Sequence, residues 1–464
     1  MKRITRRSFL EAGVAVGAAT VLPAYIARPA WGQSVSERIR TACIGLGGMG
    51  TGDAREFNHL SDVVALCDVD KVFGLKRALS AKIGRQVDGK YQQPETYTDY
   101  RRILERDDID AVSVGTPDHW HTKISVEAMQ SGKHVFCQKP LTLTLAENIL
   151  IRQACEKYGK VFQVGTQQRA QKNQFATAAL MVQKGLLGDI VRTTCIVDGG
   201  RESPLIPKGD VPESLDWNMW LGQAPYTDYL AAEIGKNPFD GLKICPWYSN
   251  SHIMFRWWFQ YSGGRITDWG AHHVDSALWI LGRQKPEQMP ISYDFKEATF
   301  LMPYQDGYPT VENQFNTPVR FRVECKFADG TDFIVTSHDK DPNGILLEGT
   351  KGRIHVNRAR IAGKLYEEGA HKTFTEEDFT SIYNGKPFEG HKQNFIRCIR
   401  EGGTPVSDAC TNILSMHVCH LSNIACRLQR NIQWDAVAEK IVGDDQAAAF
   451  FSRKQRKGFE LPTV

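Results

Sequence analysis

Short apolar runs alternate with longer amphipathic stretches along the first third of the chain. Five runs of consecutive apolar residues predict strands that are buried on both faces, at residues 41–44, 63–67, 111–115, 134–137 and 161–164. Between them, stretches typical of helices cover residues 51–60, 122–131 and a segment that ends near residue 158. Strands that alternate with helices in this way indicate a parallel sheet of the α/β type.

The pattern changes in the second half, where predicted strands follow one another without long helices between them. These strands cover residues 319–327, 332–337, 344–347 and 353–356. Turns are expected at Asp329-Gly330 and Lys351-Gly352, where glycine follows a polar residue. Helices are predicted from about residue 391 and over residues 412–430. An extended sheet after the first α/β unit indicates a second domain with an exposed face suited to dimerisation.

The first residues have the composition of an export signal. Arg6-Arg7 precede an apolar run at residues 12–22, and small residues then lead to Gly32. This order is typical of a secretory signal peptide, and the paired arginines indicate the twin-arginine type. We expect residues 1–33 to be this signal, with cleavage after Gly32 and export to the periplasm; an uncleaved amphipathic helix is the alternative. The apolar run is too short to form a stable membrane span.

Composition and charge narrow the class of protein further. The 464 residues are 42% hydrophobic and 24% charged, which is typical of a globular protein and excludes wholesale disorder. The net charge of +4 resides in the first 33 residues, where Lys2 and four arginines face Glu11 alone. A body without net charge argues against a nucleic-acid partner. The 11 cysteines form no C-x-x-C pair, so we expect buried packing residues rather than a disulfide framework.

A glycine-rich turn follows the first predicted strand. It reads Gly45-Leu46-Gly47-Gly48-Met49-Gly50, which fits G-x-G-x-x-G, and Asp68 ends the next strand 18 residues after Gly50. Such a turn lets the backbone approach a pyrophosphate and lets the helix pack on the strand. A turn used for packing alone is the alternative, but the order strand, turn, helix, strand and acid favours dinucleotide binding. Because Asp68 would repel a 2′-phosphate, NAD is favoured over NADP.

Polar residues also stand where the later parallel strands end. Thr116-Pro117-Asp118-His119-Trp120-His121 follow one strand, Gln138-Lys139-Pro140 the next, and Gln167 to Arg169 the last. Because ligands bind beyond the carboxyl ends of parallel strands, we expect these residues and Asp68 along one edge. Lys139 stands at a strand exit where Pro140 fixes the backbone, which favours a functional lysine over an ordinary surface lysine.

A helical stretch over residues 266–282 carries Asp268, His272 and Asp275 at spacings that place them on one helix face. A histidine between two carboxylates can accept a proton near neutral pH. The alternatives are a core histidine and a metal site, but a third ligand is not evident, so no metal is predicted. Seven tryptophans between Trp217 and Trp279 are expected to fill a core, to line a pocket for sugar rings, or both.

Together these motifs make the chain after residue 33 resemble the Gfo/Idh/MocA oxidoreductases almost from end to end. The motifs that carry the resemblance are Gly45–Gly50, Asp68, Thr116–His121, Gln138-Lys139-Pro140, Val164–Arg169, Asp268-x-Gly270-x-His272-x-x-Asp275 and, as in exported bacterial members, Trp434-Asp435. The resemblance implies an N-terminal Rossmann domain with a doubly wound parallel sheet over residues 34–168. It also implies a C-terminal α/β domain over residues 169–464, with a large open, mostly antiparallel sheet, for substrate binding and oligomerisation.

The resemblance also implies an NAD(P)-dependent oxidoreductase that acts on a hydroxyl or keto group of a sugar, glycoside or cyclitol. Its catalytic residues would be Lys139, Asp268 and His272. Its substrate would contact Arg169, Trp257, Asp268, His272 and His273. Its cofactor, NAD and tightly bound, would contact the turn and the strand ends: Gly45, Leu46, Gly47, Gly48, Met49, Gly50, Asp68, Thr116, Pro117, His119, His121, Gln138, Lys139 and Gln167.

The resemblance leaves one departure and two alternatives. Many members have Glu where this chain has Gln138, so a charge that could tune Lys139 is missing. An NAD-dependent glycoside hydrolase, which uses transient oxidation and elimination, is the alternative within the fold. A non-catalytic nucleotide-binding protein is the third reading. In each case we expect a homo-oligomer, a dimer or tetramer, and a carbohydrate rather than a nucleic acid as partner.

Overall fold

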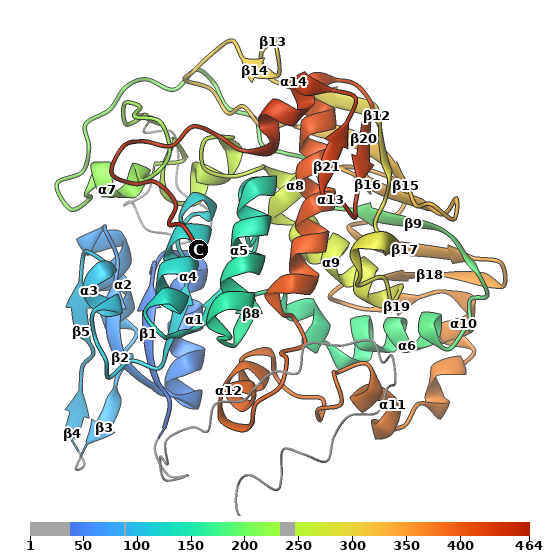
Figure 1. Ribbon diagram of the computed structural model, residues 1–464, viewed down its shortest axis with the longest axis horizontal. Coiled ribbons are helices and arrows are strands. Elements are labelled where there is room, and N and C mark those ends of the chain that lie inside the picture. Colours follow the sequence, from blue (N-terminus) through green and yellow to red (C-terminus); the bar gives the residue numbers. More distant parts are fainter. Residues whose placement is uncertain (1–37, 88–89, 233–245) are drawn as a thin grey trace, which may run out of the picture. The chain divides into compact units, whose positions relative to one another are not determined.

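A six-stranded parallel sheet forms the N-terminal part of the protein, and its first strands are blue in Figure 1. The computed structural model describes residues 38–87, 90–232 and 246–464, so the predicted signal sequence lies outside the described residues. The strand order is β5 (Glu95–Tyr97), β2 (Asp62–Cys67), β1 (Arg40–Ile44), β6 (Ala111–Val114), β7 (His134–Cys137) and β8 (Phe162–Val164). The order reverses between β1 and β6, which is the topological switch point where doubly wound folds bind ligands.

Helices cover both faces of this sheet, because successive side chains of the strands point to opposite sides. On one face Phe136 of β7 packs in a hydrophobic cluster with Phe57 of α1 (Gly48–Leu60). On the other face Val135 belongs to the cluster that contains Ile124 of α4 (His121–Gln130) and Ile151 of α5 (Leu145–Tyr158). The predicted strands and helices of this part are therefore confirmed, and the sheet adds the short edge strand β5.

Nine strands form the second, larger sheet. Their order is β19 (Ile361–Ala362), β18 (Gly352–Val356), β17 (Gly344–Gly349), β9 (Ile190–Ile196), β16 (Asp332–Thr336), β15 (Arg320–Lys326), β12 (Ser292–Thr299), β20 (Ile432–Asp435) and β21 (Lys440–Val442). β9 and β16 run parallel, and the other described pairs are antiparallel. The sheet is open and mostly antiparallel, as expected, although the sequence pattern located four of its strands.

Helices α9 (Gly270–Ile280) and α13 (Ala409–Leu428) pack against the second sheet and separate it from the helices of the first (Figure 1). α13 contacts β12 on one side and α5 on the other, and nearly all of its residues are buried. Among the described residues, no helix combines the length and apolar composition that a membrane crossing requires. α13 is thus a core helix that joins the two halves of the described chain.

The C-terminal residues return to the first sheet and end beside α4 (Figure 1). Lys123 Nζ donates a hydrogen bond to the Glu460 carbonyl oxygen at 2.7 Å, and Gln130 Nε2 donates to the Thr463 carbonyl at 3.0 Å. The remaining elements are α2 (Arg77–Ser80), β3 (Arg85–Val87), β4 (Lys90–Gln92), α3 (Arg101–Leu104), α6 (Thr177–Gln183), α7 (Trp217–Leu221), β10 (Ala231–Ala232), β11 (Tyr248–Ser249), α8 (Arg265–Asp268), β13 (Tyr304–Gln305), β14 (Tyr308–Pro309), α10 (Lys364–Glu367), α11 (Glu376–Ser381), α12 (His391–Glu401) and α14 (Asp445–Ala448).

Candidate functional site

A cavity of about 880 Å³ opens at the carboxyl ends of the parallel strands. One wall comes from the turns that follow β1, β2, β6, β7 and β8. The other wall comes from later parts of the chain: residues 199–201, the 3-10 turn His252–Trp257, helices α8 and α9, and Arg358. A cavity of this size, at the switch point of a doubly wound sheet, suits a cofactor together with a small substrate.

The glycine turn after β1 allows close approach of backbone to backbone. A Cβ atom on Gly45 would lie 2.5 Å from the Thr116 nitrogen, and one on Gly50 would lie 1.8 Å from the Gly45 oxygen. Gly47, Gly48 and Met49 line the cavity at the start of α1. No described side chain caps this end of the helix, and its first turn carries no acid. Its N–H groups and the helix dipole therefore suit a phosphate group, so these residues fit a dinucleotide.

Asp68 lines the cavity at the end of β2 and also holds the glycine turn. Its Oδ2 accepts a hydrogen bond from the Leu46 nitrogen at 2.6 Å, and its Oδ1 accepts one from the Asp70 nitrogen at 2.8 Å. Burial raises the pKa of Asp68 to about 6, although both hydrogen bonds act in the opposite direction. Leu46 and Gly50 lie behind the turn. The other predicted cofactor residues in the cavity wall are Gly45, Thr116, Pro117, Gln138, Lys139 and Gln167.

The side chain of Gln138 forms a hydrogen bond with Asp53 and not with Lys139. Its Nε2 donates to Asp53 Oδ2 at 2.7 Å, and Asp53 in turn lies 3.0 Å from Lys392 Nζ. Asp53 is 1% exposed, and this burial raises the pKa of its carboxyl group. A glutamate in place of Gln138 would set a second negative charge against Asp53. The neutral amide instead donates a hydrogen bond, so it suits this surrounding.

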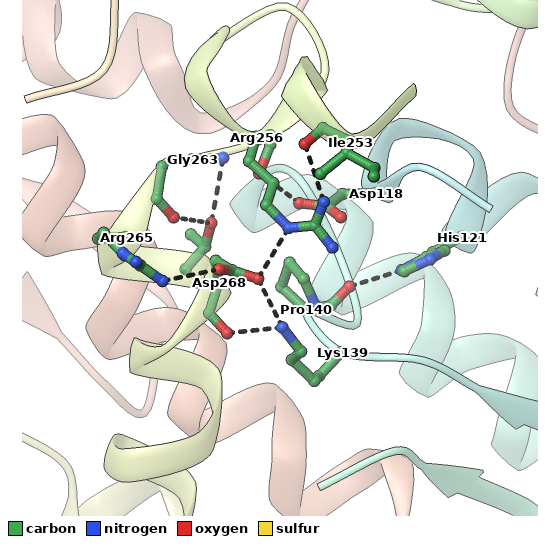
Figure 2. Close-up of polar contacts among 12 residues, drawn as sticks. Asp118, His121, Lys139, Pro140, Ile253, Arg256, Gly263, Arg265 and Asp268 are labelled. Atoms are coloured by element: carbon green, nitrogen blue, oxygen red, sulfur yellow. Dashed lines mark hydrogen bonds and ion pairs between the residues drawn. The ribbon is translucent and has the colours of Figure 1, made fainter. Parts of the chain in front are cut away.

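Lys139 and Asp268, which both line the cavity, form a close ion pair (Figure 2). Lys139 Nζ donates to Asp268 Oδ1 at 2.6 Å and to the Asp268 carbonyl oxygen at 2.8 Å. Arg256 Nε lies 3.3 Å from the same Oδ1, and Arg265 Nη1 lies 3.5 Å from Oδ2. Burial alone would raise the pKa of Asp268, but Lys139, Arg256 and Arg265 together lower it well below its usual range. Asp268 is therefore a carboxylate that keeps the ammonium of Lys139 in place.

His272 is buried in the cavity wall one turn further along. Its Nδ1 has no hydrogen-bond partner in the part of the chain that the structure describes. Burial, followed by the charges of Lys139 and Arg358, lowers the pKa of His272 well below its usual value. The imidazole is therefore neutral, so one of its two ring nitrogens carries no proton. His273 does not line the cavity: its Nε2 lies 2.9 Å from Asn343 Oδ1.

The predicted common face of Asp268, His272 and Asp275 exists only in part. The helix breaks at Trp269, so Asp268 ends α8 and His272 lies in the first turn of α9. Asp275 points into the core, where its two oxygens accept hydrogen bonds from Arg169 Nε and Nη2 at 2.8 and 2.6 Å. Asp275 is therefore not a partner of His272. Within the described residues, no group of three or more His, Cys, Asp or Glu is arranged to hold a metal ion.

Three residues assigned from the sequence to cofactor or substrate lie behind the cavity. Arg169 is buried beside Asp275, so it has no surface for a substrate. His119 Nε2 lies 2.9 Å from the Trp220 carbonyl. His121 bridges two strand ends, because its Nδ1 lies 2.7 Å from the Pro140 carbonyl and its Nε2 lies 2.9 Å from the Thr116 carbonyl. His121 thus fixes the turn that carries Lys139 (Figure 2).

Several cavity residues were not selected from the sequence. Asp118 lines the cavity and accepts a hydrogen bond from Ser262 Oγ at 2.5 Å, and burial raises its pKa to about 7. In the sequence, only its place in the Thr116–His121 motif at the end of a strand pointed to Asp118. Five arginines also reach the cavity, and only the fold brings them together: Arg77, Arg201, Arg256, Arg265 and Arg358.

The tryptophans divide as expected between pocket and core. Four of them line the cavity: Trp220, Trp247, Trp257 and Trp269. The others pack in the hydrophobic clusters: Trp217, Trp258 and Trp279. Trp257, a predicted substrate residue, therefore faces the cavity, and its ring lies 5.5 Å from the guanidinium carbon of Arg265.

Comparison with known families matches both halves of the chain. Residues 39–166 match the model of the Gfo/Idh/MocA oxidoreductase family, NAD-binding Rossmann fold, and residues 199–461 match the model of the C-terminal alpha/beta domain of that oxidoreductase family. Among solved structures, the WlbA dehydrogenase from Bordetella pertussis, in complex with NADH and UDP-GlcNAcA, is 17% identical and has a TM-score of 0.58 over 87% of this chain and 99% of its own. A levoglucosan dehydrogenase, in complex with NADH and levoglucosan, is 16% identical, with a TM-score of 0.55 over 85% and 99%.

Curated relatives share part of the sequence. An alpha-N-acetylgalactosaminidase of Shewanella oneidensis is 32% identical over 225 residues, which are 41% of this chain and 45% of the relative. A glycosyl hydrolase family 109 protein of Stenotrophomonas maltophilia is 31% identical over 232 residues, or 49% and 50%. The matched part of the chain thus spans half or less of the length of these relatives.

The first prediction concerns the stability that depends on the buried ion pair of Arg169 and Asp275. Arg169→Met leaves a carboxylate buried without its partner, so the free energy of unfolding should fall by about 3–5 kcal/mol. The double variant Arg169→Met/Asp275→Leu removes both charges and should recover most of this loss. Urea unfolding of the three proteins measures both effects. A single variant as stable as the wild type would contradict this account of the pair.

Asp118 generates a prediction on pH dependence. Its pKa is about 7 in the folded protein and its ordinary value is 3.8, so the folded state binds this proton more tightly. Its contribution to stability is full below about pH 4 and is lost as the pH rises to about 7. Asp118→Asn does not titrate. Between about pH 4 and about pH 7, the unfolding free energy of the wild type should therefore fall relative to that of Asp118→Asn. Denaturant unfolding curves measured at several pH values test this, and a constant difference would refute it.

Proposed function

We propose, on the premise that this chain belongs to the Gfo/Idh/MocA family of oxidoreductases, that it transfers hydride between a nicotinamide cofactor and a hydroxyl or keto group of a sugar, glycoside or cyclitol. One observation carries the proposal: Lys139, Asp268 and His272 line the same cavity as the uncapped glycine turn. The turn that suits a dinucleotide and the residues that suit proton transfer therefore line one cavity. Membership of the family indicates the class of reaction, and the three residues indicate how a proton would be transferred.

The cofactor side of the cavity suits NAD. The N-terminus of α1, at Gly47 to Met49, offers N–H groups to a pyrophosphate. Asp68 lies at the end of β2, where a carboxylate binds the adenosine ribose and opposes a 2′-phosphate. When bound, the nicotinamide supplies a two-electron acceptor or donor of hydride. We propose tight binding of this cofactor, in keeping with the expected export of a folded protein.

Residues from both walls suit proton transfer at the reacting oxygen. His272 is neutral and lines the cavity, so its imidazole can take the proton of a substrate hydroxyl. Lys139 Nζ has hydrogens beyond the two that bond Asp268, and one can bond the substrate oxygen as negative charge develops there. Asp268 positions Lys139 and holds its charge. Trp257 and Trp269 offer apolar faces to a sugar ring.

A second candidate function is NAD-dependent hydrolysis of a glycoside. The specific support is the name of the relatives, glycosyl hydrolase family 109 proteins and an alpha-N-acetylgalactosaminidase, at 31–32% identity. The same cavity would then perform a transient oxidation, elimination of the aglycone and reduction of the product. Residues His272 and Lys139 serve the oxidation in either case.

We also propose where the protein acts, how its chain is divided into domains and how it assembles. Residues 1–33 would be a twin-arginine signal that directs the folded protein to the periplasm. Residues 34–168 would then form the nucleotide-binding domain, and residues 169–464 the domain that binds substrate. The large sheet offers an open surface for a homo-dimer or tetramer.

Variants of Lys139 and His272 test the catalytic assignment. Lys139→Met and His272→Ala should each lower turnover by about 10²–10⁴-fold, because each removes a group that acts on the reacting oxygen. Lys364→Met changes a lysine that is 86% exposed and serves as the matched control. Cofactor content, measured after release from each purified protein, separates a loss of cofactor binding from a loss of proton transfer. Full turnover in both variants would overturn the proposed roles.

The same assay separates the two candidate functions. A dehydrogenase accumulates reduced nicotinamide in step with the sugar oxidised. A glycoside hydrolase releases an aglycone, such as p-nitrophenol, with no net change in nicotinamide absorbance. Each outcome selects one function and excludes the other for the substrate tested.

Asp68 provides the test of cofactor choice. Asp68→Asn removes the charge that opposes a 2′-phosphate, so the ratio of the NADP and NAD dissociation constants should fall by roughly tenfold, or about 1.4 kcal/mol. The ratio is unaffected by a general loss of stability. Asp107→Asn, at an exposed position, is the control. An unchanged ratio would remove Asp68 from cofactor selection.

A further inference from the structure

The substrate side of the cavity carries more positive than negative charge. Five cationic side chains line it: Lys139, Arg201, Arg256, Arg265 and Arg358. The carboxylates near these cations are Asp268, which already faces Lys139, Arg256 and Arg265, and Asp118, whose pKa burial raises to about 7. Asp68 and Asp70 also line the cavity, but both follow β2 on the cofactor side, where Arg77 also lies. Asp268 is thus the ionised carboxylate that faces three of these cations, and it forms no ion pair with Arg201 or Arg358.

Arg358 has the least engaged of these charges. Its guanidinium carbon lies 4.7 Å from the centre of the Trp269 ring, and no described carboxylate forms an ion pair with it. Trp269 in turn packs against His272, with ring centres 5.9 Å apart. Arg358 lines the cavity and is exposed to solvent, so it stands at the rim, near the proposed base His272. Stacking on Trp269 holds the planar guanidinium while its N–H groups stay available.

The cofactor and the reacting oxygen do not account for this charge. The pyrophosphate position belongs to the N-terminus of α1, which contributes none of the five cations. A developing alkoxide needs one donor, and Lys139 supplies it. Arginine presents parallel N–H groups that match a planar carboxylate or the oxygens of a sulfate. An anionic group on the substrate is the remaining partner of suitable chemistry.

We infer that the substrate is an acidic sugar or glycoside, whose carboxylate or sulfate group binds Arg358 within the positive field of Arg256 and Arg265. The inference rests on the proposed function and names its substrate class. The sugar ring would lie against Trp269, with its reacting hydroxyl at Lys139 and His272 and its anionic group toward the rim.

Paired substrates test the inference with the purified full-length holoprotein. Glucuronate and galacturonate, with glucose 6-sulfate and galactose 6-sulfate, are compared with glucose and galactose, each also as the p-nitrophenyl glycoside. We expect at least one acidic member to exceed its neutral parent at least 30-fold in kcat/KM, measured by nicotinamide absorbance or p-nitrophenol release. The carboxylate and sulfate arms show which anion is recognised. A neutral sugar that is used equally well or better overturns the inference and leaves the proposed function intact.

A charge variant gives a test that does not depend on turnover. Arg358→Gln should weaken calorimetric binding of the preferred acidic sugar at least tenfold and leave its neutral parent unchanged. Arg360→Gln changes an exposed arginine on the same turn, outside the cavity, and should have no effect. Equal effects of Arg358→Gln on acidic and neutral sugars, or binding of neither class of acidic sugar, would refute the inference. If no sugar of any class binds or reacts, the proposed function itself fails.

Discussion

The ion pair between Lys139 and Asp268 is the contact on which the site depends. It joins residues that are 129 positions apart, one at the exit of β7 and the other at the end of α8. The ammonium bonds both the carboxylate and the carbonyl oxygen of Asp268, so it is fixed in direction as well as in position. Because Lys139, Arg256 and Arg265 keep Asp268 ionised, this carboxylate retains its charge in a largely buried setting.

The residues of the sequence motifs divide into those that face the cavity and those that support them. His121 holds the carbonyl of Pro140, and thereby the turn that carries Lys139. Arg169 and Asp275 form a buried pair one turn of α9 beyond His272, and Asn412 of α13 adds a hydrogen bond to the same carboxylate. Polar contacts behind the cavity thus hold the functional side chains in position.

The sequence predicted the first sheet well and the second only in part, for a physical reason. The central parallel strands are buried on both faces and read as unbroken apolar runs, whereas β12 has a mixed pattern because one face is partly exposed. The same limit applies to the site. Lys139 and Asp68 follow from strand ends, but the helical spacing did not show that Asp275 pairs with Arg169 in the core. Arg201 and Arg358 reach the cavity only through long-range folding.

The positive field of the cavity sets a condition on the proposed base. Burial, Lys139 and Arg358 lower the pKa of His272, which keeps the imidazole neutral but also makes it a weak proton acceptor. An anionic group bound at Arg358 would offset part of this positive charge and raise the pKa of His272 toward the range in which proton transfer is efficient. An acidic substrate would then improve its own reaction, whereas a neutral sugar in the same position would meet a poorer base. Substrate selection and proton transfer would depend on the same charges.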